Sequence, residues 1–359
     1  HDLLYLQRES KGFTNTLWRR MIQDHGFNGT PAWTSTARPL TRIIPVEWVK
    51  YLCHIDLALM LAAAGVTAWA FGWTPAAWFW IFLMVGYSTR WPVITWSYLR
   101  YDYIAALVMG MGLIKRGKHF LAGLLTGYAA VARFFPAMWL YGPGMKGIIG
   151  LTQRVVHRRL LVLASGFVLS VGAMQTIAWL DHPPETISIH FHNMIDHNTP
   201  EQLSSRRVGL ALALPYYPGQ EVPKYIEPER KQTIADQKHL RLALAGIVMV
   251  VLGWGLRNAR DEEAYALGFI PFFLLTTASY YYYVARATLF IMHGADLSKL
   301  RNRVGLAWLL GTELITNCAA IFAGPQRVFL VGNLSWAIAG YTLLMTAWFV
   351  WESHHQEAA

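Results

Sequence analysis

Long apolar runs limit what this chain can fold into. Six of them are each close to the roughly 20 residues that a helix needs to cross a bilayer. They cover residues 51–72, 93–114, 160–180, 240–256, 304–322 and 328–351. Only 14% of the residues are charged, whereas charged residues make up about a quarter of an ordinary soluble domain. The sequence therefore predicts an all-α, polytopic membrane bundle, and it excludes a disordered chain.

Shorter or interrupted apolar runs add further segments to this bundle. Three of them cover residues 76–89, 264–277 and 279–293. The stretch 120–150 is interrupted at Arg133-Phe-Phe-Pro136, where proline lacks an N–H donor and clashes with the preceding turn. We expect two short helices there, which brings the total to about eleven segments.

Basic residues in the short loops predict the orientation, because cytoplasmic loops carry an excess of Lys and Arg. Four basic stretches are mutually consistent if all of them face the cytoplasm. They lie at residues 115–118, 146–159, 257–260 and 299–303. The C-terminus is then cytoplasmic, and with eleven crossings the given sequence begins on the external side. We therefore expect one more helix upstream of His1. The expected location is a bacterial inner membrane.

The chain reads as one membrane domain at residues 46–352 with two external elaborations. The first is the segment 1–45, where residues 17–22 combine apolar side chains with two arginines, a pattern typical of an amphipathic helix on acidic headgroups. The second is a long loop at 182–239 within the membrane domain. Residues 353–359 form a cytoplasmic tail.

Charged side chains near the outer margin of the predicted bundle are candidate site residues, since charges at membrane depth are costly. Arg90, Arg100, Asp102 and Arg133 would line one outward-facing pocket. Guanidinium groups match phosphate oxygens in a bidentate way, so the pocket suits a lipid-linked phosphate. The alternative, weighed equally, is that Asp102 and an arginine merely neutralise one another.

Two further groups in the loop 182–239 are candidates for ligand contacts. Arg206 and Arg207 precede a short apolar run, which fits either a phosphate contact or a basic anchor at the membrane surface. His190, His192 and His197 are weak candidates for a divalent metal site, and the first two would share a face in an extended segment. Their spacing matches no zinc motif, so we predict no metal site and no certain cofactor.

Several motifs follow one another in an order that resembles a known family. They are Leu99-Arg100-Tyr101-Asp102, the basic turn 115–118, the stretch 120–127, Ala132-Arg133-Phe134-Phe135-Pro136, Arg207-Val208-Gly209-Leu210 and Ile270-Pro271. The order resembles the GT-C polytopic glycosyltransferases, and in particular the family-87 type that uses polyprenyl-phosphate-mannose. The resemblance spans most of the chain.

The resemblance implies inverting transfer of a sugar from a polyprenyl-phosphate donor to an acceptor at the external face. The sugar would be mannose or another hexose or pentose. An Asp or Glu in the first external loop would act as general base. Asp2, ahead of Asp24, is the candidate here, a base upstream of His1 is the alternative, and Asp102 is the candidate carboxylate of the pocket. Arg133 would stabilise the leaving polyprenyl phosphate.

Two other functions stay open. The chain could be a non-catalytic subunit that docks other membrane proteins through residues 1–45 and 182–239. A transporter is less well supported, because the charges crowd toward the outer face instead of mid-depth. Membrane lipids are expected partners in every case. Nucleic acid is not, since we interpret the net charge of +10 as a topology signal.

Overall fold

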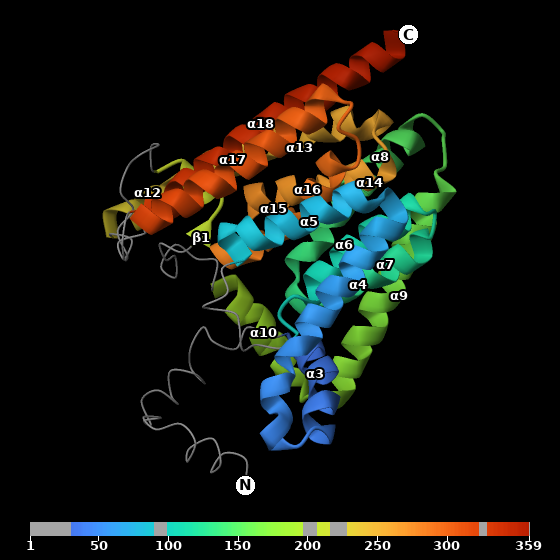
Figure 1. The fold of residues 1–359 in the computed structure, drawn as a ribbon, viewed down its shortest axis with the longest axis vertical. Helices are drawn as coiled ribbons and strands as arrows, with labels where there is room; N and C mark the ends of the chain where they lie inside the picture. Colours follow the sequence, from blue (N-terminus) through green and yellow to red (C-terminus); the bar gives the residue numbers. More distant parts are fainter. Residues whose placement is uncertain (1–29, 90–98, 197–206, 216–227, 323–328, 359) are drawn as a thin grey trace.

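The computed structural model describes residues 30–89, 99–196, 207–215, 228–322 and 329–358. This part of the chain is predominantly helical (Figure 1), which confirms the all-α prediction. Two short strands, β1 (Arg207–Val208) and β2 (Ala278–Ser279), pair antiparallel, with Arg207 opposite Ser279.

The helices follow the chain in two groups. The first comprises α3 (Pro31–Ile43), α4 (Cys53–Phe71), α5 (Trp73–Val85), α6 (Asp102–Lys115), α7 (His119–Arg133), α8 (Tyr141–Thr152), α9 (Arg158–Asp181) and α10 (Pro184–Asp196). The second comprises α11 (Leu210–Ala213), α12 (Pro228–Asp236), α13 (Lys238–Gly255), α14 (Asp261–Ala266), α15 (Phe269–Leu275), α16 (Ala287–Gly294), α17 (Leu300–Phe322) and α18 (Phe329–Ala358). Short 3-10 helices at Tyr87–Thr89, Phe135–Leu140 and Tyr280–Arg286 connect some of them.

Four helices in the described ranges are long and apolar enough to cross a membrane. They are Cys53–Phe71, Arg158–Asp181, Lys238–Asn258 and Asn333–His355. The chain therefore has the character of a membrane protein, whereas the predicted count of about 11 crossings is not confirmed.

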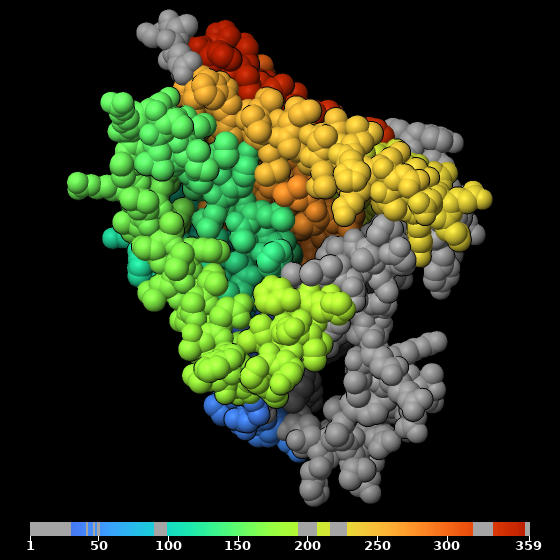
Figure 2. Space-filling model, turned by 180° about the vertical axis from the view of Figure 1, so that it is seen from behind, coloured from blue at the N-terminus to red at the C-terminus, as the bar shows by residue number. Residues whose placement is uncertain are grey.

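Apolar side chains lie exposed on two of these spans. On α9 they include Leu161, Val168 and Leu180, and on α13 they include Ile247 and Val250. Both helices reach the surface on the face shown in Figure 2, α9 in green and α13 in yellow to amber. Soluble proteins rarely expose such large apolar patches, so this surface fits contact with lipid.

The predicted break near Pro136 is confirmed. Helix α7 ends at Arg133, Phe134 has φ +60°, and the 3-10 helix Phe135–Leu140 leads into α8. Pro136 lies in the first turn of this short helix, where a missing N–H leaves no hydrogen bond unmade.

Helix α6 lies at the centre of the core. It is buried along most of its length, as expected for a helix that is apolar on all sides. It packs against α4, α7 and α14, and α7 in turn packs against α9. The C-terminal helix α18 packs against both α13 and α17, and these three helices run side by side along one flank (Figure 1).

The two predicted external elaborations are partly built into the bundle. Helix α3 packs on α9, and Arg38 forms an ion pair of 2.6 Å with Asp181 at the end of α9. The predicted amphipathic helix at residues 17–22 lies outside the described residues. The predicted loop 182–239 contains α10, β1, α11 and α12, so much of it has regular structure.

Candidate anion-binding site

The hairpin of α6 and α7 brings predicted site residues to one end of the molecule. Asp102 begins α6 and Arg133 ends α7, and the two interact electrostatically. Asp56, near the start of α4, interacts with both of them. We call the group formed by Arg100, Arg133 and Arg207 with Asp56 and Asp102 the arginine cluster.

Both carboxylates of the cluster accept hydrogen bonds from uncharged donors. Asp56 accepts from the backbone N–H groups of Arg100 and Tyr101, at 3.1 and 3.0 Å. Asp102 accepts from the backbone N–H of Tyr103 at 2.8 Å and from the hydroxyl of Tyr128 at 2.7 Å. The two residues are 2% and 3% exposed. Their lone pairs are therefore partly occupied without an arginine.

The three arginines lie against aromatic rings and backbone oxygens. The Cζ atom of Arg100 is 4.6 Å from the ring centre of Tyr281, and that of Arg133 is 5.4 Å from the ring centre of Trp33. Arg207 donates a hydrogen bond of 3.0 Å to the carbonyl oxygen of Thr277. A guanidinium that stacks on a ring keeps N–H donors at its edge for a ligand.

The 3-10 helix Tyr280–Arg286 joins the arginines into one group. The ring centre of Tyr282 is 4.6 Å from that of Tyr281, on which Arg100 stacks, and Tyr282 lies close enough to Arg133 and Arg207 to be influenced by their charges. None of these three arginines forms an ion pair with a residue that the structure describes. Of the alternative in which an arginine neutralises Asp102, the ion pair with Arg100 is therefore not found, whereas Arg90 lies outside the described residues.

Backbone strain lies directly beside two of these arginines. Leu99, which precedes Arg100, has φ +50°, and Phe134, which follows Arg133, has φ +60°. Positive φ in a residue other than glycine costs of the order of 1–3 kcal/mol and is often found at functional sites.

An apolar cavity adjoins the cluster. It has a volume of about 560 Å³, and Asp56 and Tyr101 form part of its wall, which is within the roughly 300–1,000 Å³ typical of ligand pockets. The rest of the wall is mostly apolar and comes from α4, α5 and α17, including Leu57, Met60, Trp80, Leu83, Met84 and Asn317. The cavity therefore meets the cluster at Asp56 and Tyr101, and in the described part of the chain none of the three arginines contributes to its wall.

The opposite end of α6 and α7 carries a different arrangement, in which cations are paired. Three consecutive carboxylates begin α14, namely Asp261, Glu262 and Glu263. Asp261 pairs with Lys146 at 2.5 Å and with Arg159 at 2.8 Å, and Glu262 pairs with Lys115 at 2.9 Å.

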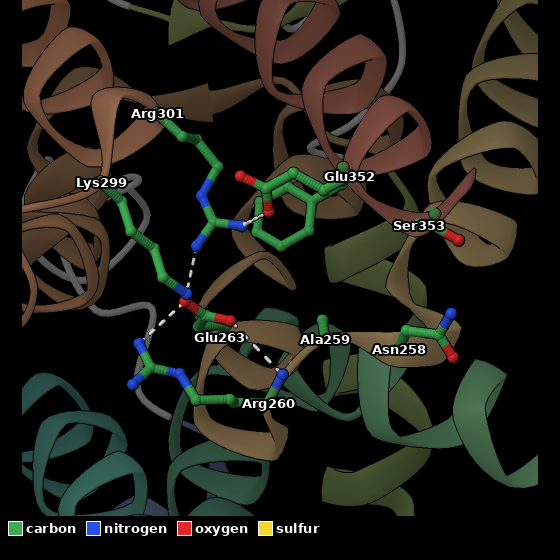
Figure 3. A pocket seen from close by; sticks show the side chains of 10 residues that line it. Asn258, Ala259, Arg260, Glu263, Lys299, Arg301, Glu352 and Ser353 are labelled. Atoms are coloured by element: carbon green, nitrogen blue, oxygen red, sulfur yellow. Dashed lines mark hydrogen bonds and ion pairs between the residues drawn. The ribbon is translucent and has the colours of Figure 1, made fainter. Parts of the chain in front are cut away.

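Glu263 completes this acidic triad. It accepts from Arg260 at 2.8 Å and from Arg301 at 2.6 Å (Figure 3). Each of the four basic stretches identified in the sequence thus contributes a cation to the same triad. The four stretches lie at one end of the molecule, and the arginine cluster lies at the other.

The remaining predicted site residues are not brought into the cluster. Asp2, Arg90, Arg206 and His197 lie outside the described residues. His190 and His192 lie on α10, which is a helix and not the extended segment considered above. Residues two apart on a helix are separated by about 200° and do not share a face. Among the described residues, no group of three or more His, Cys, Asp or Glu side chains is arranged to hold a metal ion.

Three features of the arginine cluster and the acidic triad were not predicted from the sequence. Four consecutive tyrosines at 280–283 have the pattern of membrane-interface aromatics, but Tyr281 stacks with Arg100. Nothing in the sequence indicated that the hydroxyl of Tyr128 would donate a hydrogen bond to Asp102. The acidic triad at 261–263 is visible as a run of three acids among basic loops, and this contrast could have indicated ion pairing.

Comparisons with protein-family models, with curated proteins and with solved structures find no match.

Proposed function

We propose that the chain is a membrane glycosyltransferase of the GT-C type. It would transfer mannose or another hexose or pentose from a polyprenyl-phosphate donor to an acceptor at the external face. The observation that carries this proposal is a group of three arginines that form no ion pair with a described residue, in a cluster whose Asp56 also lines a cavity of about 560 Å³. Fixed cations suit a phosphate and the apolar wall suits an isoprenoid chain.

The chemistry requires a leaving phosphate and a base. The acceptor hydroxyl loses its proton to a carboxylate, its oxygen attacks the anomeric carbon, and the bond from that carbon to the phosphate oxygen breaks. Arg133 and Arg100 would bind the phosphate as its negative charge grows, because donors fixed in advance stabilise developing charge. Asp102 is the base candidate within the cluster, and Asp2 is the one that the family resemblance favours.

The proposed orientation follows the distribution of charge. The end with the acidic triad carries the four basic stretches, so by the positive-inside rule it would face the cytoplasm. The arginine cluster and α10 would then face outward. About eleven segments in a bacterial inner membrane remain part of this proposal.

The test replaces Arg133 with alanine and compares it with a matched arginine. Arg116 also stacks on a tryptophan, with its Cζ atom 4.9 Å from the ring centre of Trp69, but at the other end of α6. Charge-assisted hydrogen bonds contribute about 1.5–3 kcal/mol. We therefore expect Arg133→Ala to weaken binding of undecaprenyl phosphate by about tenfold or more, and Arg116→Ala to leave it within about twofold.

Binding would be measured by titrating the purified protein with undecaprenyl phosphate under native mass spectrometry. Equal affinities for Arg133→Ala and the unmodified protein would contradict the proposal. Absence of any bound polyprenyl phosphate, together with a fixed stoichiometry of other membrane proteins, would favour the non-catalytic subunit instead.

A further inference from the structure

Asp56 contacts the rest of the arginine cluster through backbone groups. Its two carboxylate oxygens accept from the N–H groups of Arg100 and Tyr101. These two amides follow Leu99, which has φ +50°. Asp56 therefore fixes a strained turn from a helix that lies 44 residues earlier in the chain.

The turn is fixed from a second side as well. The indole N–H of Trp33 donates to the carbonyl oxygen of Leu99 at 3.0 Å, and the ring of Trp33 also lies under Arg133. Strained backbone persists only where its surroundings hold it in place. With both contacts made, the side chain of Arg100 lies over the ring of Tyr281.

The negative charge of Asp56 bears on whether this residue contacts a phosphate directly. A carboxylate near a phosphate site repels the ligand, so on electrostatic grounds alone it would weaken binding. Two backbone N–H groups stabilise this charge and are in turn ordered by it. The carboxylate is thus better suited to shaping the site than to contacting the phosphate.

We propose that Asp56 is a positioning residue, which holds the Leu99–Tyr101 turn and thereby aims Arg100 at the phosphate of the lipid donor. This inference rests on the proposed function. Asp56 acts only through Arg100, so its effect on phosphate binding disappears when the guanidinium of Arg100 is absent.

The test is a double-mutant cycle with Asp56→Asn, Arg100→Ala and the double variant. Asparagine keeps one acceptor oxygen but replaces the other with an NH₂ group that cannot accept. We expect each single variant to weaken binding of undecaprenyl phosphate by a similar factor, about tenfold. The double variant is expected to bind as weakly as Arg100→Ala alone, since two residues that act as one unit are not additive.

A second measurement reads the turn without a ligand. Hydrogen exchange of the peptide covering residues 99–103 is expected to rise in Asp56→Asn and to stay unchanged in the control Asp181→Asn. Asp181 accepts hydrogen bonds from the side chains of Ser35 and Arg38, at 3.0 and 2.6 Å, so its replacement frees no turn amide.

The outcomes separate this inference from the proposed function. If the unmodified protein binds undecaprenyl phosphate and Arg100→Ala weakens it, but Asp56→Asn does not, only the role of Asp56 is overturned. Losses that multiply in the double variant also overturn it. If the unmodified protein binds no polyprenyl phosphate, the proposed function falls together with this role, and the exchange data still decide whether Asp56 holds the turn.

Discussion

Glu263 shows at the scale of one residue how the paired end differs from the arginine cluster. The residue is 3% exposed. Burial raises the pKa of its carboxyl, but Arg301 and Arg260 lower it more, so the pKa lies below its ordinary value of 4.5. Arg301 is itself 1% exposed and also pairs with Glu352 at 2.5 Å. The two guanidiniums thus keep a buried carboxylate ionised.

The lowered pKa predicts how stability depends on pH. A carboxylate whose pKa is lower in the folded state stabilises the fold above its unfolded pKa, and this contribution is lost as the pH falls through the folded pKa. We expect Glu263→Gln to lower the free energy of unfolding by about 3 kcal/mol at pH 7, because it leaves Arg301 without one of its buried partners. The difference from the unmodified protein should shrink as the pH falls below 4.5.

Chemical unfolding in detergent at pH 7 and at about pH 4 would measure this difference. The lower pH is chosen because it lies below the pKa of a glutamate in the unfolded state. Glu185→Gln, on an exposed residue of the first turn of α10, is the control and should change little at either pH. A deficit for Glu263→Gln that is the same at both pH values would show that charge pairing is not what Glu263 contributes.

At the scale of elements, apolar runs and helix breakers located most helices. The runs 51–72 and 160–180 correspond to α4 (Cys53–Phe71) and α9 (Arg158–Asp181), and Pro136 located the end of α7. These predictions hold because they depend on local properties, namely apolar length and the missing N–H of proline.

Contacts between distant segments could not be predicted in this way. Lys146 meets Asp261 across 115 residues, and Tyr128 meets Asp102 because α6 and α7 form a hairpin. Four predicted site residues did converge, which are Arg100, Asp102, Arg133 and Arg207. They converged because each lies at the end of an element. The pairing of each carboxylate depends on side-chain register, which apolar periodicity does not encode.

The crossing of α7 and α9 depends on glycine. A Cβ atom on Gly123 would overlap the carbonyl oxygen of Leu163, whereas a Cβ atom on Gly172 of α9 would meet nothing within 4 Å. Small residues allow helix backbones to approach closely in membrane bundles. The same substitution should therefore have opposite effects at the two positions.

We expect Gly123→Ala to lower the free energy of unfolding by about 1–3 kcal/mol, because the two backbones must move apart. Gly172→Ala should raise it by up to about 1 kcal/mol, since alanine has the higher helix propensity. Thermal unfolding of both variants in the same detergent would compare them. If both shift the melting temperature in the same direction, close packing at Gly123 is not what stabilises this crossing.

At the scale of the whole molecule, the two ends differ in how their charges are compensated. Helix α6 has 14 residues and spans roughly 21 Å between the arginine cluster and the acidic triad. At the triad each cation that the four basic stretches contribute to it lies within ion-pair distance of a carboxylate. At the cluster three arginines face two carboxylates that already accept other hydrogen bonds. The anion of the proposed donor would give these arginines the partner that they lack among the described residues.

Which side of the membrane each end faces can be tested through the two ends of α9. This helix has 24 residues, about 36 Å in length, so its ends lie on opposite sides if it crosses the bilayer. Gln153 precedes α9 and Ser188 follows it on α10, and both are exposed. Each would be replaced by cysteine in a background where Cys53 and Cys318, the two free cysteines, are serine.

In the proposed orientation, a membrane-impermeant maleimide labels Ser188→Cys in intact spheroplasts and labels Gln153→Cys only after permeabilisation. The physical reason is that the basic stretch 146–159 stays in the cytoplasm with the acidic triad. Labelling in the reverse order would place the arginine cluster in the cytoplasm, where it would meet a donor on the inner leaflet. Labelling of both positions without permeabilisation would show that α9 does not separate two compartments, and the exposed apolar face of α9 would then have to be covered by another protein.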